Sequence, residues 1–152
     1  MPALEIKKAG DPVLREKCQP ITTFDRKLRL LLNNMADTMY KADGVGLAAP
    51  QIGLSIAVVV IDVGEGVIEL INPKIIEREG AVEDTEGCLS VPGIYGTVER
   101  SARVVAEYQN RFGKKHTIEG TGLLARAIQH ELDHLDGILF TDKVTSLEQG
   151  EE

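Results

Sequence analysis

Tryptophan is absent from this chain of 152 residues, and cysteine and histidine are scarce, with two and three residues respectively. A small secreted protein that depends on disulfides carries more cysteine than Cys18 and Cys88, which also lie far apart in the sequence. No apolar run approaches the roughly 20 residues that a membrane-spanning helix needs, and residues 1–8 lack the apolar stretch of a signal peptide. We therefore expect a cytoplasmic protein with reduced thiols and no membrane partner.

The chain also lacks an excess of positive charge. Lys and Arg together number 17, against 24 Asp and Glu, and the net charge is −7. An acidic surface repels the phosphates of nucleic acids, so we expect no direct nucleic-acid binding. With no repeats and no interdomain linker in view, we expect one domain over residues 1–145, followed by a short, acidic and disordered tail over residues 146–152.

Hydrophobic periodicity predicts two main helices and several strands in one α+β domain. The first helix is expected over about 25–42, with Asp25 as its N-cap and Gly44 as the C′ residue that ends it. The second is expected over about 122–136, ended by Gly137, and it is apolar around so much of its circumference that it should lie buried at the centre. Strands are expected over about 56–62, 67–71, 75–79, 98–107 and 115–119.

The most informative segment is His130-Glu131-Leu132-Asp133-His134, in the second helix. Two histidines four residues apart on a helix face the same side and could bind one metal ion, while Glu131 could reach the water on that ion. Such sites usually carry out hydrolysis, with three protein ligands and one position left for water. A pair of ordinary surface histidines is the alternative, but the acidic residue between them in an apolar helix argues against it.

The third ligand must come from elsewhere in the chain. Phe140 stands where metzincin proteases carry a third histidine, and the 18 residues after His134 are too few for the later helix that supplies a glutamate in thermolysin-like proteases. The remaining histidine, His116, lies beside two lysines in a segment expected to be exposed. Cys88 follows a glycine that permits tight turning, in an expected loop, and we favour it as a thiolate ligand over a buried apolar filler. A set of two histidines and one cysteine suits Fe(II), Ni(II), Co(II) or Zn(II).

Three segments together resemble the three signature motifs of the peptide deformylases. They are residues 44–51 (Gly-Val-Gly-Leu-Ala-Ala-Pro-Gln), 86–90 (Glu-Gly-Cys-Leu-Ser) and 129–135 (Gln-His-Glu-Leu-Asp-His-Leu). Their order and separations are also similar, and the resemblance extends over about residues 5–142. It implies mixed or antiparallel sheets packed around a central metal-binding helix. It also implies a bacterial enzyme that removes the N-formyl group from the initiator methionine of new polypeptides and releases formate.

The resemblance implies roles for residues at the matching positions. The metal ligands would be Cys88, His130 and His134, with Fe(II) as the usual native ion and Ni(II), Co(II) or Zn(II) as substitutes. Glu131 would be the general base and acid, while the Gln51 side chain and the Leu89 backbone N–H would stabilise the oxyanion. The implied substrate-binding residues are Val45, Gly46, Glu86, Gly87, Leu123, Arg126 and Ala127.

Two features depart from the family pattern, and two alternatives stay open. Relatives often carry an apolar residue where this chain has Arg126, whose stem could line a pocket while its charge reaches solvent or a carboxylate. The sequence also ends early and acidic where many bacterial members continue into a longer, often basic helix, so we expect at most a transient ribosome contact. The alternatives are a zinc endopeptidase, which the Cys88 motif disfavours, and a non-catalytic metal-binding module, which would need a fourth ligand and would leave Glu131 without a role.

Overall fold

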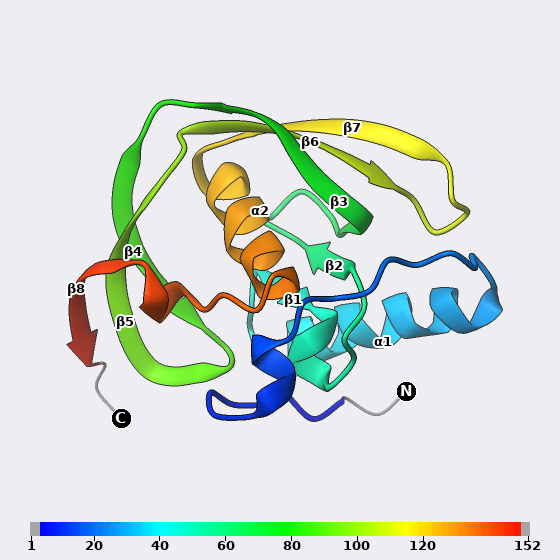
Figure 1. Ribbon diagram of the computed structural model, residues 1–152, viewed down its shortest axis with the longest axis horizontal. Coiled ribbons are helices and arrows are strands. Elements are labelled where there is room, and N and C mark those ends of the chain that lie inside the picture. Colours follow the sequence, from blue (N-terminus) through cyan, green and yellow to red (C-terminus); the bar gives the residue numbers. More distant parts are fainter. Residues whose placement is uncertain (1–3, 150–152) are drawn as a thin grey trace.

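The computed structural model describes residues 4–149, in which two sheets lie around one helix (Figure 1). The larger sheet has the strand order β1-β2-β3-β6-β7 and the smaller has the order β4-β5-β8. All pairs of named strands are antiparallel. The strands are β1 (Gly46–Ala48), β2 (Val58–Ile61), β3 (Ile68–Glu79), β4 (Val82–Cys88), β5 (Val91–Arg100), β6 (Arg103–Gln109), β7 (Lys115–Thr121) and β8 (Val144–Gln149). The helices are α1 (Arg26–Lys41) and α2 (Gly122–Leu135), with short 3-10 helices η1 (Pro12–Arg15), η2 (Ala49–Ile52) and η3 (Phe140–Asp142).

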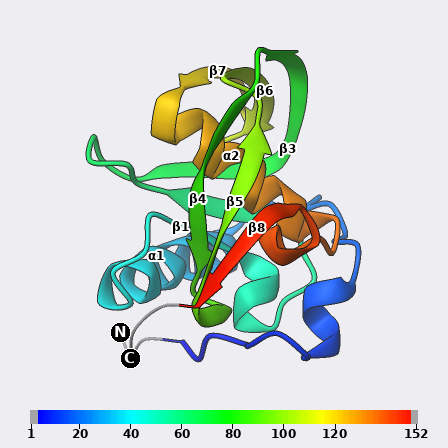
Figure 2. The same ribbon diagram turned by 90° about the vertical axis from the view of Figure 1, so that its left-hand side faces the viewer.

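The predicted α+β class and the central position of the second helix are confirmed. Helix α2 lies between the two sheets, and Figure 2 shows β4, β5 and β8 in front of it. Nine of its 14 residues are buried. Its apolar side packs on the larger sheet, where Ile128 of α2 joins Val104 and Ala106 of β6 in one core cluster. Because one side of α2 fills this core, its opposite side, which carries the histidines, faces the smaller sheet.

Both ends of the first helix show how local sequence sets its length. The Asp25 carboxylate accepts a hydrogen bond from the Leu28 N–H at 3.0 Å, as expected of an N-cap. At the other end Asp43, with φ 59°, occupies the left-handed position expected for Gly44. The prediction for Gly44 was therefore wrong by one residue: its N–H instead bonds the Met39 carbonyl at 3.0 Å, which completes the turn. Helix α1 packs Leu32 and similar side chains on β1 and β2.

Two expected strands form a single one. Residues 67–71 and 75–79 were predicted to be separated at Asn72-Pro73, yet β3 continues through both with an irregular register between Ile71 and Lys74. Asn72 adopts φ 53°, and its side chain bonds the backbone of Ile21 at 2.7 and 2.8 Å. These bonds to a distant segment hold the irregular backbone in place, so the strand bends without ending.

Three further boundaries differ from the predictions around the smaller sheet. The expected strand over 98–107 is two strands that meet at a corner, where the Gln129 side chain bonds both the N–H and the carbonyl of Ser101 at 2.9 Å. The expected loop around Cys88 is a hairpin between β4 and β5. The disorder predicted from residue 146 is wrong for 146–149, which pair with β5 in β8, and 150–152 lie outside the described residues. No helix within residues 4–149 is long and apolar enough to cross a bilayer.

Candidate metal centre

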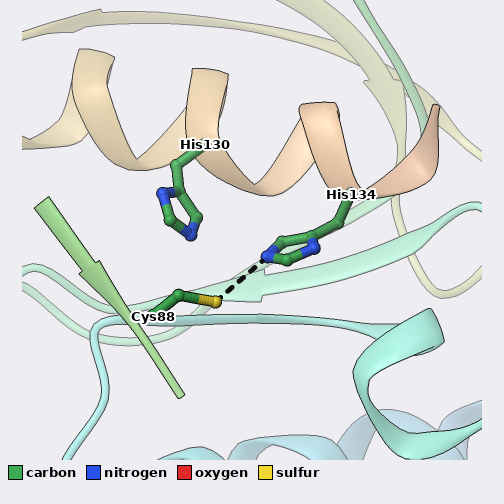
Figure 3. Close-up of side chains that lie close together, drawn as sticks. All are labelled: Cys88, His130 and His134. Carbon is green, nitrogen blue, oxygen red and sulfur yellow. Dashed lines mark hydrogen bonds between the residues drawn. The ribbon is translucent and has the colours of Figure 1, made fainter. Parts of the chain in front are cut away.

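Three potential metal ligands converge where α2 passes the hairpin of β4 and β5. The ligand atoms of Cys88, His130 and His134 all lie within 4.8 Å of one another, and both imidazoles and the thiol point into a common space (Figure 3). The Cys88 Sγ lies 3.4 Å from His134 Nε2. Two ligand atoms on one tetrahedral ion are about 3.5 Å apart, given metal–nitrogen and metal–sulfur bonds of about 2.0–2.3 Å. The group therefore fits one divalent ion, and no fourth His, Cys, Asp or Glu joins it within residues 4–149.

The two histidines differ in their surroundings. His134 is 1% exposed, and its Nδ1 has no hydrogen-bond partner within residues 4–149. Burial lowers its pKa to about 3, so its imidazole is neutral and can donate a lone pair. At His130 burial acts in the same direction, but hydrogen bonds to Cys88 and Glu86 outweigh it and raise the pKa. The Glu86 Oε1 lies 2.8 Å from His130 Nδ1, which leaves Nε2 of His130 for a metal.

Glu131 is a buried carboxylic acid beside this group. It is 4% exposed, and its Oε1 has no hydrogen-bond partner among the described residues. Burial raises the pKa of the carboxyl to about 7. A Cβ placed on Gly46 would lie 2.5 Å from Glu131 Oε2, so the carboxyl packs directly on the backbone of β1. A group that gains and loses a proton near neutral pH suits general acid–base chemistry.

Gln51 is fixed from both ends of its amide. Its Oε1 accepts a hydrogen bond from the Ala48 N–H at 2.9 Å, and its Nε2 donates to Ser90 Oγ at 3.1 Å. The same Nε2 lies 3.5 Å from Cys88 Sγ. Because Gln51 is 1% exposed, this donor is preorganised next to the candidate ligands. Ser90 was not among the predicted site residues, although it belongs to the same motif as Cys88.

A cavity of about 520 Å³ opens onto these groups. The predicted site residues that line it are Val45, Gly46, Gln51, Glu86, Gly87, Cys88, Leu89, Leu123, Arg126, Ala127, His130 and Glu131. Only His134 of the predicted set is outside this lining. Val45 and Leu123 are about half exposed, at 45% and 53%, as expected for residues at a pocket mouth. Ile94 and Tyr95 of β5 also line the cavity, and no motif in the sequence pointed to them.

A cluster of charges lies against the site. Glu86 accepts hydrogen bonds from Arg100 through both of its oxygens, at 2.8 and 2.9 Å. Arg126 Nη1 also reaches Glu86, at 2.6 Å, and Arg100 Nη1 reaches Asp133 at 2.6 Å. Burial alone would raise the pKa of the Glu86 carboxyl, but the hydrogen bonds from Arg100 and His130 hold it well below its ordinary value. The charge of Arg126 thus reaches a carboxylate rather than solvent.

His116 and Cys18 lie outside the site, and Phe140 lies beside it. His116 is exposed on β7 and stacks on Tyr108. Cys18 is half-buried against the main core, and burial raises its pKa to about 11. Phe140, at the position where a metzincin would carry a histidine, stacks near the His130 ring with centroids 6.0 Å apart. Phe140 thus packs beside the imidazole without supplying a ligand.

Comparison with known proteins settles the family. The family model for polypeptide deformylase matches residues 3–150. The chain belongs to the polypeptide deformylase family. A peptide deformylase from Acetivibrio thermocellus is 58% identical over 139 residues, which cover 91% of this chain and 82% of the relative. One from Halothermothrix orenii is 56% identical over 154 residues, covering 100% and 99%.

The solved structures agree with this assignment. The crystal structure of peptide deformylase from Thermotoga maritima matches with a TM-score of 0.94 at 44% identity, covering 95% of this chain and 99% of the other. Deformylases are metal-dependent enzymes that remove the N-formyl group from nascent peptides, and this chain is an enzyme of that family. Membership of this family argues against the two alternatives left open by the sequence, a zinc endopeptidase and a non-catalytic metal-binding module.

Proposed function

We propose that this chain hydrolyses the formyl amide of N-formylmethionyl peptides at one divalent ion held by Cys88, His130 and His134. The observation that carries the proposal is the convergence of three ligand atoms within 4.8 Å, next to a buried carboxyl oxygen of Glu131 that no group in the described part of the chain bonds. The cavity of about 520 Å³ gives a peptide end access to that point.

The donor set favours certain ions. One thiolate and two imidazoles form a softer set than one with a carboxylate, and this set suits Fe(II), Ni(II), Co(II) and Zn(II). We propose Fe(II) as the native ion, in keeping with the family resemblance, and the other three as substitutes. When bound, the ion would act as a Lewis acid that lowers the pKa of a water molecule and polarises the formyl oxygen.

The chain's own residues would move the protons and stabilise the charge. Glu131, through its unpartnered Oε1, would accept a proton from the attacking water as the water oxygen bonds to the formyl carbon. It would return the proton to the amine nitrogen as the C–N bond breaks and formate leaves. The Gln51 Nε2 and the Leu89 N–H would donate hydrogen bonds to the oxyanion, and loss of one such donor typically costs about 10²–10³ in rate.

Substrate binding would use the remaining cavity residues. Val45, Leu123 and Ala127 offer apolar surface for a methionine side chain, and Gly46 lets the peptide backbone approach β1. Gly87 has no room for a side chain, because a Cβ there would lie 2.8 Å from Tyr95 Cε1. Glu86 already bonds Arg100, Arg126 and His130, so it would act through these contacts.

The expected partners are formylated nascent peptides in the bacterial cytoplasm, reached through transient ribosome contact at most. A net charge of −7 supports the expectation that the chain does not bind nucleic acid directly. We expect no membrane partner.

Formate release from a formyl-Met-Ala-Ser peptide tests the function. The protein would be prepared anaerobically with Fe(II) and, in parallel, with Ni(II). We expect turnover in both, no turnover in Cys88→Ala, and loss of turnover in Glu131→Ala while its metal content stays near that of the wild type. Substantial activity in Glu131→Ala would show that the general base is assigned wrongly. No turnover with one ion bound per chain would favour another amide substrate.

A further inference from the structure

Arg126 is a buried charge that the reaction itself does not use. It lies on α2 one turn before His130 and is 9% exposed. Its guanidinium makes three hydrogen bonds: Nη1 donates to Glu86 Oε2 at 2.6 Å and to the Val98 carbonyl at 2.9 Å, and Nη2 donates to the Val82 carbonyl at 2.8 Å. Val82 lies on β4 and Val98 on β5. One side chain therefore joins α2 to both strands of the hairpin that ends at Cys88.

Arg126 shares the neutralisation of Glu86 with Arg100. Glu86 and Asp133 are two carboxylates, and Arg100 bonds both of them, at 2.8 and 2.6 Å. Lys143 reaches Asp133 from a partly exposed position, 3.1 Å away. The second buried cation beside Glu86 is Arg126. Without it, Glu86 would share the remaining guanidinium, that of Arg100, with Asp133, and the carbonyls of Val82 and Val98 would lose a donor.

Glu86 in turn fixes the orientation of His130. Its Oε1 lies 2.8 Å from His130 Nδ1, while its Oε2 accepts from Arg126 and Arg100. A ligand histidine whose second nitrogen is held by a carboxylate keeps one ring orientation, and removing such support typically costs about 10–100-fold in metal affinity or activity.

We propose that Arg126 is a positioning residue for the metal centre: it locks Glu86 between the hairpin and α2, and through Glu86 it holds the His130 imidazole toward Cys88 and His134. This rests on the metal site proposed above. The competing role is that of a cavity wall, because Arg126 also lines the substrate cavity. If Arg126 only lined the cavity, replacing it would change substrate affinity and leave metal affinity unchanged.

Cobalt binding without substrate separates the two roles. The dissociation constant of Co(II) would be measured by competition with a chelator, and the visible absorption of the bound Co(II) would report its ligand geometry. In Arg126→Met we expect Co(II) to bind about 10–100-fold more weakly with an altered absorption spectrum, and kcat to fall more than KM rises. Arg126→Lys, which keeps the charge, should recover part of both. Arg78→Met is the matched control, because Arg78 is exposed and its hydrogen bond to Gln129 of α2 is long, at 3.4 Å.

Coupling to Glu86 sharpens the test. If Arg126 acts through Glu86, adding Arg126→Met to Glu86→Gln should change the Co(II) affinity by less than twofold. Wild-type Co(II) affinity and spectrum in folded Arg126→Met would overturn the proposal, and a raised KM alone would assign the wall role. Should Arg126→Met not fold, as judged by circular dichroism, Arg126→Gln is read in the same way. Absence of formate release by the wild type would contradict the proposed function and leave this comparison valid.

Discussion

Gly46 is the residue whose size the catalytic site depends on most directly. A Cβ at this position would lie 2.5 Å from Glu131 Oε2 and 2.9 Å from Glu131 Cδ. Distances under 3.0 Å require one of the groups to move, and here the moving group is the end of a flexible side chain. The substitution should therefore displace Glu131, the proposed general base, while leaving the backbone of β1 in place.

We predict that Gly46→Ala lowers kcat about 10²-fold or more, because general acid–base catalysis contributes about 10²–10⁴-fold and needs the base in position. Metal content and melting temperature should stay near wild type. Formate release, metal analysis and thermal unfolding check these three expectations. Wild-type kcat in this variant would show that Glu131 tolerates displacement, and a large fall in melting temperature would show that β1 had moved instead.

Chemistry limits the residue types of the proposed metal site, so they could be proposed from the sequence, whereas their further contacts could not. Two histidines at helical spacing with a glutamate between them need a third ligand, and Cys88 was the candidate with suitable chemistry and backbone. The target of Arg126 was left open between solvent and a carboxylate, because a long side chain can reach either. Only the folded hairpin places the Val82 carbonyl and Glu86 within its reach.

At the scale of the elements, the C-terminal end of α2 is held by backbone hydrogen bonds and a close contact. Gly137, with φ 74°, bonds the His134 carbonyl through its N–H at 3.1 Å, and Ile138 bonds the Asp133 carbonyl at 2.9 Å. A Cβ on Gly137 would lie 2.6 Å from the Arg15 carbonyl oxygen. The helix end that carries His134 therefore packs against the backbone of η1 with no space for a side chain.

We predict that Gly137→Ala destabilises the fold by about 2 kcal/mol or more, as the sum of left-handed strain, about 1 kcal/mol, and a clash between backbone and Cβ. The matched control is Gly122→Ala at the start of the same helix, where φ is 55° and no atom lies within 4 Å of the added Cβ. That variant should lose only the strain energy. Urea unfolding of both variants measures the difference, and equal losses would show that the contact with Arg15 is not tight in solution.

Helices were predicted closely and strands less so, for a physical reason. Caps such as Asp25 and Gly137 act within one turn, so the sequence contains them locally. The bend at Asn72 depends on bonds to Ile21, and the corner at Ser101 depends on Gln129. Such bonds join segments far apart in the chain, and short apolar runs do not reveal where they form.

For the molecule as a whole, the two sheets bring together segments that are distant in sequence. Cys88 belongs to the smaller sheet, and the histidines belong to a helix whose core packing is with the larger one. A separate apolar cluster around Phe140 packs η1 and η3 against β5. A bound ion would thus connect parts of the fold that otherwise meet through the charge cluster of Glu86 and through side-chain packing.

Metal removal should therefore lower the stability of the whole chain. An ion that binds only the folded state adds about 2.7 kcal/mol when its free concentration is 100 times its dissociation constant. For a protein near this size, 1 kcal/mol corresponds to about 2–4 °C in melting temperature, so Ni(II) should raise the melting temperature by about 5–11 °C over the apoprotein. The increase should grow with the logarithm of free Ni(II) and vanish in Cys88→Ala, which would still fold. An equal increase in Cys88→Ala would mean that Ni(II) stabilises the chain at some other place, and would contradict the assignment of Cys88 as a ligand.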